Sequence, residues 1–417
     1  MNVNLTIFKN RNFLFYWLSG WISSLGDAVF VIALTWMLVE KTGSPAIVGS
    51  YLFVLGVTKA VFVLFGGVIV DRMDSRKLMI RSDVARAIIM FAFFMAGVFG
   101  NQPLWLFYVV AVTFGTVESI AEPAGITSGT KVVKKDFYSQ AISLLIIAGN
   151  LSAIIGPVVG AGIVYLGGTN LAILINGISF VISALLLSIV RFQSDDEEQS
   201  EETPEPILAS LTSGIKYFFK SPVIRAMAIQ AFFTNAAVGA TVVAAPFLAK
   251  QLGYGVNGYG LMNTGIGIGS AIGAIVFSVI AIRNPKPYMT LLTVLFQGIF
   301  VFLIGLSHPL WLIIGLFIIV GVHEAAINVV APSVNHAIIP PKMFARVLSV
   351  MILIMSGSMP FSQAIAGWLM EFVSPMTIFI GCGLLEMAAA VGTFMVPAVR
   401  HFKSIEDTVR ETVDSAN

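Results

Sequence analysis

The residues of this chain that could do chemistry are few, and they lie in apolar surroundings. Glu118 and Glu122 stand four residues apart in the stretch that begins LWLFYVVAVTF, and Asp27, Lys59 and Glu324 lie in similar runs. A charged side chain at the centre of a bilayer costs about 2.5–3.5 kcal/mol, so such residues usually face an interior cavity and act there. A carboxyl in such a cavity can hold and release a proton, or bind a cationic compound.

The two glutamates share one helix face, because residues i and i+4 stack. Proton-driven exchange needs an acid that holds a proton near neutral pH and releases it when the cavity opens to the other side. A cationic compound could compete with that proton for the carboxylate. A simpler role remains open for Glu122, whose side chain could reach the lipid headgroups or pair with Lys131 or Lys135.

The other charges within apolar segments have simpler expected roles. Lys59 is expected to neutralise one of the acids, with Asp27 as the first candidate. Glu324 follows His323 in VHEAAINVV, which is not the HExxH pattern of a zinc site. Glu386 lies in the last apolar segment, where a structural role is favoured. The sequence offers no nucleotide loop or metal cluster, so we predict no metal, no cofactor, no catalytic residue and no enzyme activity.

Composition defines the setting of these residues. Of the 417 residues, 57% are hydrophobic and 11% are charged, whereas soluble domains carry about 25% charged residues. Most of the surface must therefore face lipid. The net charge of +2 comes without a basic run, so no nucleic-acid partner is expected. The only cysteine, Cys382, allows no intrachain disulfide.

Apolar segments long enough to cross a bilayer follow one another along the chain. About 20 apolar residues in a helix span the hydrocarbon core, and twelve segments reach that length: 13–39, 46–70, 78–100, 103–125, 138–166, 169–191, 223–249, 257–283, 287–306, 309–333, 343–370 and 375–399. With the loops on alternating sides, only Lys41 and Lys250 of the 24 Lys and Arg residues fall opposite the N-terminus, and Lys59 lies within a span. The positive-inside rule then places both termini in the cytoplasm.

The chain is expected to form two bundles of six helices. We predict an N-terminal bundle at 1–191, a cytoplasmic acidic linker with an amphipathic helix at 192–220, a C-terminal bundle at 221–400 and a cytoplasmic tail at 401–417. The acidic run SDDEEQSEETPEP is interpreted as a solvated hinge, with a partner-binding segment as the alternative. The halves repeat with an offset of 206 residues, so that GTVESIAEP aligns with GVHEAAINV and Glu118 with Glu324.

Two parallel repeats of six helices are typical of major facilitator transporters, whose halves are related by a pseudo-twofold axis. The loop after the second span resembles the signature of that superfamily: GGVIVDRMDSRK has a glycine, three residues and then Asp-Arg, and it ends in a basic pair. Simple anchoring by positive charge is the alternative. The resemblance implies a latch at the cytoplasmic gate, made by Gly67, Asp71, Arg72, Arg76 and Lys77.

The fifth span, with GNLSAIIGPVVGAG, resembles the antiporter motif of exporters in the superfamily. Small residues at this spacing also allow close helix packing, which is the alternative. The motif residues are Gly149, Gly156, Pro157, Gly160 and Gly162.

Three further stretches resemble the drug/proton antiporter branch that holds macrolide-efflux proteins and the enterobactin exporter: SLGDAVFVIALTWMLVEKTGS, GGVIVDRMDSRKLMIRSDVARA and IIPPKMFARVLSVM. In that superfamily spans one, four, seven and ten line the central cavity. The resemblance therefore implies that Asp27, Glu118, Glu122 and Glu324 face it. The arginine that many proton-coupled members carry early in span four is missing here, so the acids themselves must carry any coupling.

The sequence thus predicts an all-α membrane protein of twelve transmembrane helices with the major facilitator fold, acting as a monomer in the cytoplasmic membrane of a bacterium. We expect a secondary active exporter that works by alternating access and exchanges protons for a hydrophobic or amphipathic compound such as a drug or macrolide. The alternatives are a siderophore exporter, a lysolipid transporter and a membrane sensor or scaffold without transport. Possible substrate contacts, which could equally be packing, are Trp21, Trp36, Phe232, Phe233 and Met355.

Overall fold

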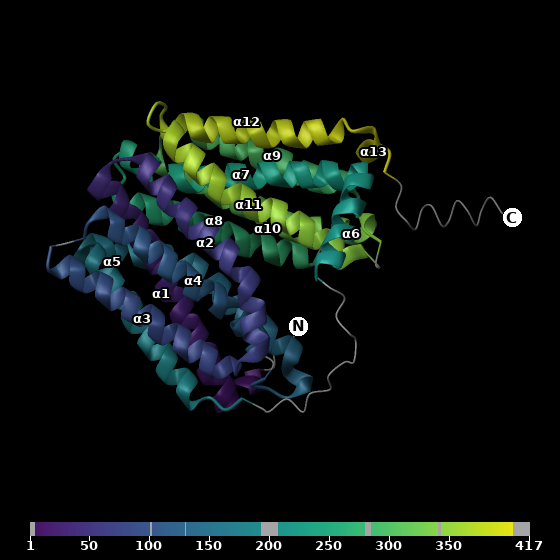
Figure 1. Cartoon of the computed structure of the whole chain (residues 1–417). Helices are drawn as coiled ribbons and strands as arrows, with labels where there is room; N and C mark the ends of the chain where they lie inside the picture. The colour runs from purple at the N-terminus through teal and green to yellow at the C-terminus, as the bar shows by residue number, and fades with distance from the viewer. Residues whose placement is uncertain are drawn as a thin grey trace. The chain divides into compact units, whose positions relative to one another are not determined.

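The computed structural model describes residues 5–100, 102–129, 131–192, 207–279, 285–340 and 343–402 (Figure 1). Within these ranges the chain forms helices and no strands. The first half contains two short 3-10 helices and five α-helices: η1 (Leu5–Lys9), α1 (Arg11–Thr42), α2 (Pro45–Arg72), α3 (Ser75–Val98), α4 (Leu104–Ser128), η2 (Lys135–Phe137) and α5 (Tyr138–Ile189). The acidic linker lies outside the described residues.

The second half continues with eight α-helices in the described ranges: α6 (Ile207–Lys220), α7 (Pro222–Gln251), α8 (Gly255–Val279), α9 (Pro287–Leu306), α10 (Leu310–Ile338), α11 (Phe344–Leu369), α12 (Pro375–Phe394) and α13 (Pro397–Arg400). The short helix α6 is the amphipathic helix expected after the linker. It packs against the start of α11, where Arg346 Nη1 donates to Ser213 Oγ at 3.3 Å.

The twelve predicted spans are all found as helical segments in the described chain. Ten helices are long and apolar enough to cross a membrane. One of them, α5, holds two predicted spans, separated at Gly168 by a φ of 77° that favours glycine. The helix α3 is the twelfth segment, and it falls outside the ten because charged residues fill its first turns. The prediction of an all-α membrane protein is confirmed.

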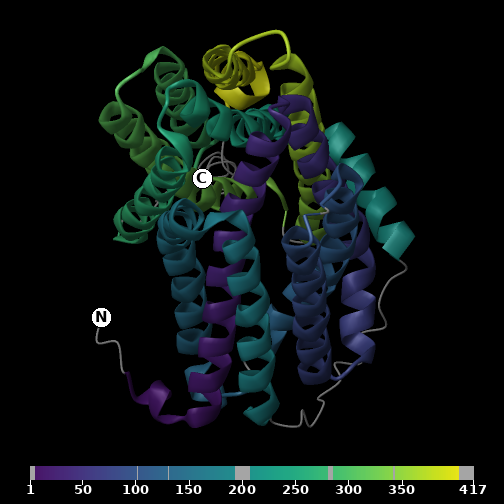
Figure 2. The ribbon, with the colours of Figure 1, turned by 90° about the vertical axis from the view of Figure 1, so that its left-hand side faces the viewer.

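Packing divides the chain into two compact units. Unit 1 comprises residues 1–200 and 249–264, and unit 2 comprises residues 201–248 and 265–417. In unit 1, α5 packs along both α1 and α3, while α4 packs on α2 and α3 (Figures 1 and 2). In unit 2, α9 lies between α10 and α12.

Small residues bring α1 and α5 into close contact. A Cβ atom added at Gly160 would lie 3.0 Å from Val29 Cα, and one added at Gly156 would collide with Ala28. Further along α5, Ser179 faces Gly26 of α1 in the same way. The helix that holds Asp27 is therefore fixed on both sides of that residue by α5.

In unit 2 two close crossings use other helices. Gly298 of α9 meets Gly383 of α12, since a Cβ at Gly298 would lie 2.8 Å from the Gly383 carbonyl oxygen. Gly239 of α7 meets Ser362 of α11. Glu386, which is 1% exposed, is buried beside Gly298.

Candidate functional site: a charged cavity in unit 1

A cavity of about 350 Å³ opens between the helices of unit 1. It is unusual for an apolar chain, because acidic, basic and hydroxyl side chains make up much of its wall. The lining residues are Ser19, Gly20, Ser23, Ser24, Asp27, Lys59, Met79, Asp83, Arg86, Glu118, Ala121, Gly125 and Ser183. They come from α1, α2, α3, α4 and the second part of α5.

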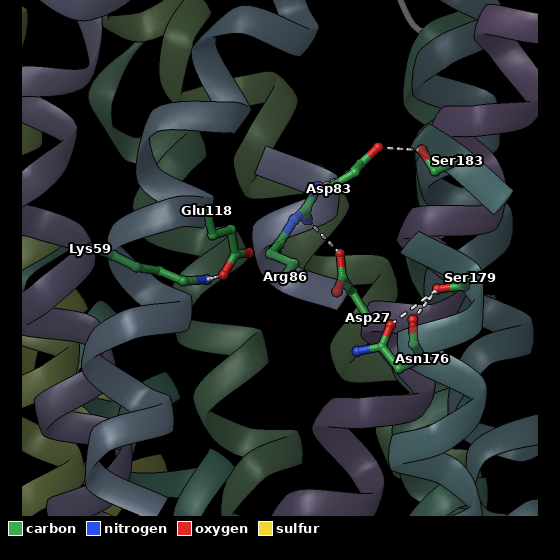
Figure 3. Close-up of polar contacts among 8 residues, drawn as sticks. All are labelled: Asp27, Lys59, Asp83, Arg86, Glu118, Asn176, Ser179 and Ser183. Atoms are coloured by element: carbon green, nitrogen blue, oxygen red, sulfur yellow. Dashed lines mark hydrogen bonds and ion pairs between the residues drawn. The ribbon is translucent and has the colours of Figure 1, made fainter. Parts of the chain in front are cut away.

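An ion pair joins α2 to α4 at this cavity. Lys59 Nζ lies 2.7 Å from Glu118 Oε2, and the two side chains are 38% and 25% exposed. The pair lies within two predicted spans, where neither charge could remain unpaired without a large cost in free energy. Glu118 is thus closely neutralised by its partner (Figure 3).

A second set of polar contacts surrounds Arg86 of α3. Its Nη2 atom lies 2.5 Å from Asp83 Oδ1, three residues away on the same helix. The other oxygen of Asp83 accepts a hydrogen bond of 2.6 Å from Ser183 Oγ on α5. The guanidinium also packs over the ring of Phe180, with 4.3 Å from Cζ to the ring centroid. Arg86 is therefore held by α3 and α5 (Figure 3).

Asp27 makes a longer ion pair than either Asp83 or Glu118. Its Oδ2 atom is 3.5 Å from Arg86 Nη1, while its Oδ1 atom is buried and has no hydrogen-bond partner in the described structure. Arg86 is the only described cation that forms an ion pair with Asp27, and Lys59 pairs with Glu118 instead. Of the three cavity acids that the structure describes, Asp27 is the one with a buried carboxylate oxygen that has no hydrogen-bond partner.

The charges of the described lining do not cancel. Three carboxylates, those of Asp27, Asp83 and Glu118, face two cations, Lys59 and Arg86. With every group ionised, this set of five side chains carries a net charge of −1. One proton or one singly charged cation would make this set neutral.

The structure corrects one sequence expectation and leaves others open. The expectation that Lys59 pairs first with Asp27 is wrong, because Lys59 contacts Glu118 and Arg86 contacts Asp27. The side chain of Glu122 lies outside the described residues. Glu324 belongs to α10 of unit 2 and not to the charged cavity.

Two members of this network, Asp83 and Arg86, together with Ser183, were not among the sequence candidates. The acid and the arginine lie in the first turns of span three, where charged residues are easily counted as cytoplasmic anchors. Asp83 and Arg86 are three residues apart, with Val84 and Ala85 between them, and an apolar run follows. This spacing is typical of a pair on one helix face and indicates that both residues belong to the helix and not to the loop.

The loop motif is only partly described. Asp74 caps α3, since its side chain accepts from the backbone N–H groups of Arg76 and Lys77. Arg76 Nε donates to the carbonyl of Leu187 at 3.3 Å, and Arg76 Nη2 donates to that of Ser188. Arg76 thereby caps the end of α5. The side chains of the other motif residues, Gly67, Asp71 and Arg72, lie outside the described residues.

The antiporter-like glycines divide into two groups. Gly156 and Gly160 make the close crossing with α1, and the carbonyl of Pro157 faces Gly260 within unit 1. Gly149 and Gly162 have no neighbouring atom within 4 Å of an added Cβ. Close helix packing is thus a visible role for two of the glycines.

The aromatic candidates lie apart from the charged cavity. Trp36 Nε1 donates to Glu40 at 2.6 Å, and Trp21 stacks on Trp17. In unit 2, Phe232 and Phe233 line an apolar groove of about 530 Å³ between α7, α11 and α12. Met355, on α11, is partly buried and is not part of that lining.

Comparison with known proteins identifies the class. The chain matches the family model of the transmembrane secretion effectors, a major facilitator family, over residues 3–415. It therefore belongs to that family, and it is a multi-pass membrane transporter. Among the residues that the structure describes, no group of three or more His, Cys, Asp or Glu side chains could hold a metal ion.

Individual relatives are distant but cover most of the chain. The uncharacterized MFS-type transporter YkuC of Bacillus subtilis is 21% identical over 98% of this chain and 97% of its own length. The multidrug efflux pump Tap of Mycolicibacterium fortuitum is 24% identical over 90% and 93%. The putative bacilysin exporter BacE of Bacillus amyloliquefaciens is 29% identical over 58% and 61%.

Solved structures agree on the fold. The nucleoside transporter NupG superposes with a TM-score of 0.75 at 14% identity, over 97% of this chain and 100% of its own. A bacterial homologue of the iron transporter ferroportin gives 0.69 at 13% identity, over 92% and 99%. The predicted major facilitator fold is confirmed.

Proposed function

We propose that the chain is a secondary active exporter of the cytoplasmic membrane, with both termini in the cytoplasm, which exchanges protons for a hydrophobic or amphipathic compound that carries one positive charge. It works by alternating access, as a monomer. Asp27 is the acid that holds either the proton or the cationic group of the compound. Relatives named as an efflux pump and an exporter support the direction of transport.

The observation that carries this proposal is the unequal treatment of the three cavity acids. Lys59 lies 2.7 Å from Glu118, and Arg86 lies 2.5 Å from Asp83. Asp27 keeps a buried oxygen without a partner. A buried polar atom without a partner costs free energy, so a proton or an ammonium group that bonds to Asp27 Oδ1 would remove that cost.

The excess charge of −1 also bears on the rival cargoes. An anionic siderophore or an anionic lysolipid would add to an existing negative charge in a medium of low dielectric, where Coulomb repulsion is strong. A monocation would cancel that charge. The geometry therefore favours a cationic amphipathic compound.

The test uses purified protein in liposomes with an acidic interior, with ethidium and a macrolide as probes. We expect the wild type to accumulate the probes and an uncoupler to abolish accumulation. Asp27→Asn should lower the accumulation about tenfold or more, the effect of losing some 1.4 kcal/mol of differential binding. Asp27→Glu, which keeps the carboxyl, is the matched control.

Accumulation that ignores the uncoupler would remove proton coupling from the proposal. A fully active, proton-driven Asp27→Asn protein would show that another acid carries the proton. The absence of any transport of ethidium or a macrolide, by a folded wild type, would contradict the proposed cargo class.

A further inference from the structure

Arg86 serves two carboxylates, and it serves them unequally. Its guanidinium lies 2.5 Å from Asp83 and 3.5 Å from Asp27, and its Nε atom is buried without a partner. The arginine is 8% exposed and Asp83 is 2% exposed, so water screens the contact between these two residues little. The position of one positive charge is thus decided by the competition between a buried acid, Asp83, and a partly exposed acid, Asp27.

We propose that Asp83 is a positioning residue that draws Arg86 away from Asp27 and so sets the pH at which Asp27 exchanges its proton. The proposal rests on Asp27 being the proton site of the proposed function. Asp83 lines the same cavity, but both of its carboxylate oxygens are engaged, one by Arg86 and the other by Ser183. It acts through Arg86, and Ser183 holds it in place from α5 with a hydrogen bond of 2.6 Å.

The geometry explains why the arginine does not simply move to Asp27. The ring of Phe180 packs against the guanidinium of Arg86, with 4.3 Å between the ring centroid and Cζ, and Ser183 Oγ donates a hydrogen bond to Asp83 Oδ2. Both supports come from α5, the helix that also packs against Gly26 of α1. The chain therefore fixes Arg86 toward α3, at the far limit of contact with Asp27.

Every charged group that faces Asp27 in the described cavity belongs to this balance. Arg86 and Asp83 come from α3, Lys59 from α2 and Glu118 from α4. Lys59 and Glu118 form their own pair at 2.7 Å, and their opposite charges largely cancel at a distance. A rearrangement of the Asp83–Arg86 pair would thus change the pH at which Asp27 exchanges its proton more than any other change among these charged groups.

Two substitutions should act in opposite directions. Asp83→Asn removes the competing carboxylate and leaves Arg86 free to pair with Asp27, so Asp27 should release its proton at lower pH. Arg86→Gln removes the cation and leaves Asp83 in place, so Asp27 should keep its proton to higher pH. A neighbouring opposite charge shifts a titration by about one to three pH units, and we expect a displacement of about one unit each way.

The experiment is an infrared titration of the full-length protein in lipid nanodiscs, which follows the carbonyl band of protonated carboxyl groups from acid to alkaline pH. The contribution of Asp27 is the part of the band that Asp27→Asn removes. The same pH series is run for wild type, Asp83→Asn, Arg86→Gln and the conservative control Asp83→Glu. The pH dependence of ethidium efflux from liposomes gives a second readout of the same midpoint.

We expect midpoints displaced in opposite directions for Asp83→Asn and Arg86→Gln, with Asp83→Glu close to wild type. Two unchanged midpoints, or two that move in the same direction, would overturn the positioning role. If Asp83→Asn does not fold, the displacement in Arg86→Gln still decides, because an unmoved midpoint there excludes control through the arginine. A wild-type band with no contribution from Asp27 would instead defeat the proposed proton site, so the two failures are distinguishable.

Discussion

The two halves of this transporter differ at aligned positions, which are charged in the first half and mostly uncharged in the second. With the offset of 206 residues, Asp27 aligns with Phe233 and Arg86 with Leu292. The first half therefore builds a cavity whose described lining has five charged side chains, whereas the second half builds an apolar groove that Phe233 helps to line. Of the charged set, only Glu118 keeps a charged counterpart, Glu324. The charged cavity thus belongs to the first half and the apolar groove to the second, although the two halves are built from the same number of helices.

The same comparison holds for the packing of the first and fifth helices of each half. In unit 1 the small residue is Gly156 on α5, against Ala28 of α1. In unit 2 the aligned position is Ser362 on α11, and the glycine has moved to Gly239 on α7. Each crossing needs one residue without a side chain, but the helix that supplies it differs. The close approach is common to both halves, and the glycine pattern is not.

The largest effect is expected when an acid is placed in the apolar groove of unit 2. We expect Phe233→Asp to destabilise the folded protein by about 2.5–3.5 kcal/mol, the cost of a charge in an apolar span without a partner. The yield of folded protein and its thermal midpoint in detergent measure this. Phe233→Leu is the matched control and should stay near wild type. A stable aspartate variant would mean that the groove already accommodates charge.

The packing comparison predicts the next largest effect. Gly156→Ala should cost about 1–3 kcal/mol, because the added methyl group overlaps Ala28 and the two helices must separate. Gly162→Ala, in the same helix, meets no atom within 4 Å and should leave the thermal midpoint unchanged or slightly raised. Equal behaviour of the two variants would show that α1 and α5 are not held at this crossing.

In unit 1, the ion pair between Lys59 and Glu118 is expected to support transport only when its two charges balance. Glu118→Gln should lower proton-driven transport about tenfold, an effect of roughly 1.4 kcal/mol, because it leaves Lys59 uncompensated. The double variant Lys59→Gln with Glu118→Gln removes both charges, keeps the sum of −1 and should recover most of the activity. Failure of the double variant to recover, in liposomes with folded protein, would move the proton site toward Glu118.

The smallest effect is expected for the buried acid of unit 2. Glu386 lies between α9 and α12, and its Oε2 atom has no hydrogen-bond partner in the described structure. It lies outside the charged cavity. Glu386→Gln keeps the shape of the side chain and should change transport less than about twofold, well within the 1.4 kcal/mol that a tenfold change requires. A loss as large as that of Asp27→Asn would give unit 2 a charge-handling role of its own.

The sequence predicts the helices well and their contacts poorly, for a physical reason. Runs of about 20 apolar residues identify spans regardless of what they touch, and even the break at Gly168 lies between the two predicted segments. The charged residues in spans one, two and four are equally visible. Which cation meets which acid depends on the rotation of each helix about its axis, and so Lys59 was assigned to the wrong partner.

Span three shows the same limit in another form. Arg86 lies so near the loop predicted to be cytoplasmic that the positive-inside rule accounts for it without any further role, and Asp83 lies only three residues before it. Only the position of α5 reveals that Ser183 and Phe180 enclose them. A neighbour more than 90 residues away in the chain leaves no trace in local spacing.

The net charge of −1 on the described cavity residues has a consequence for the force that can drive transport. A transporter that carries one monocation outward for each proton carried inward moves no net charge across the bilayer. The membrane potential, worth about 2.3 kcal/mol per elementary charge at 100 mV, then cannot drive it, and the pH difference alone sets the attainable concentration ratio. Such a pump would keep working in a depolarised cell and stall in one whose interior and surroundings share the same acidity.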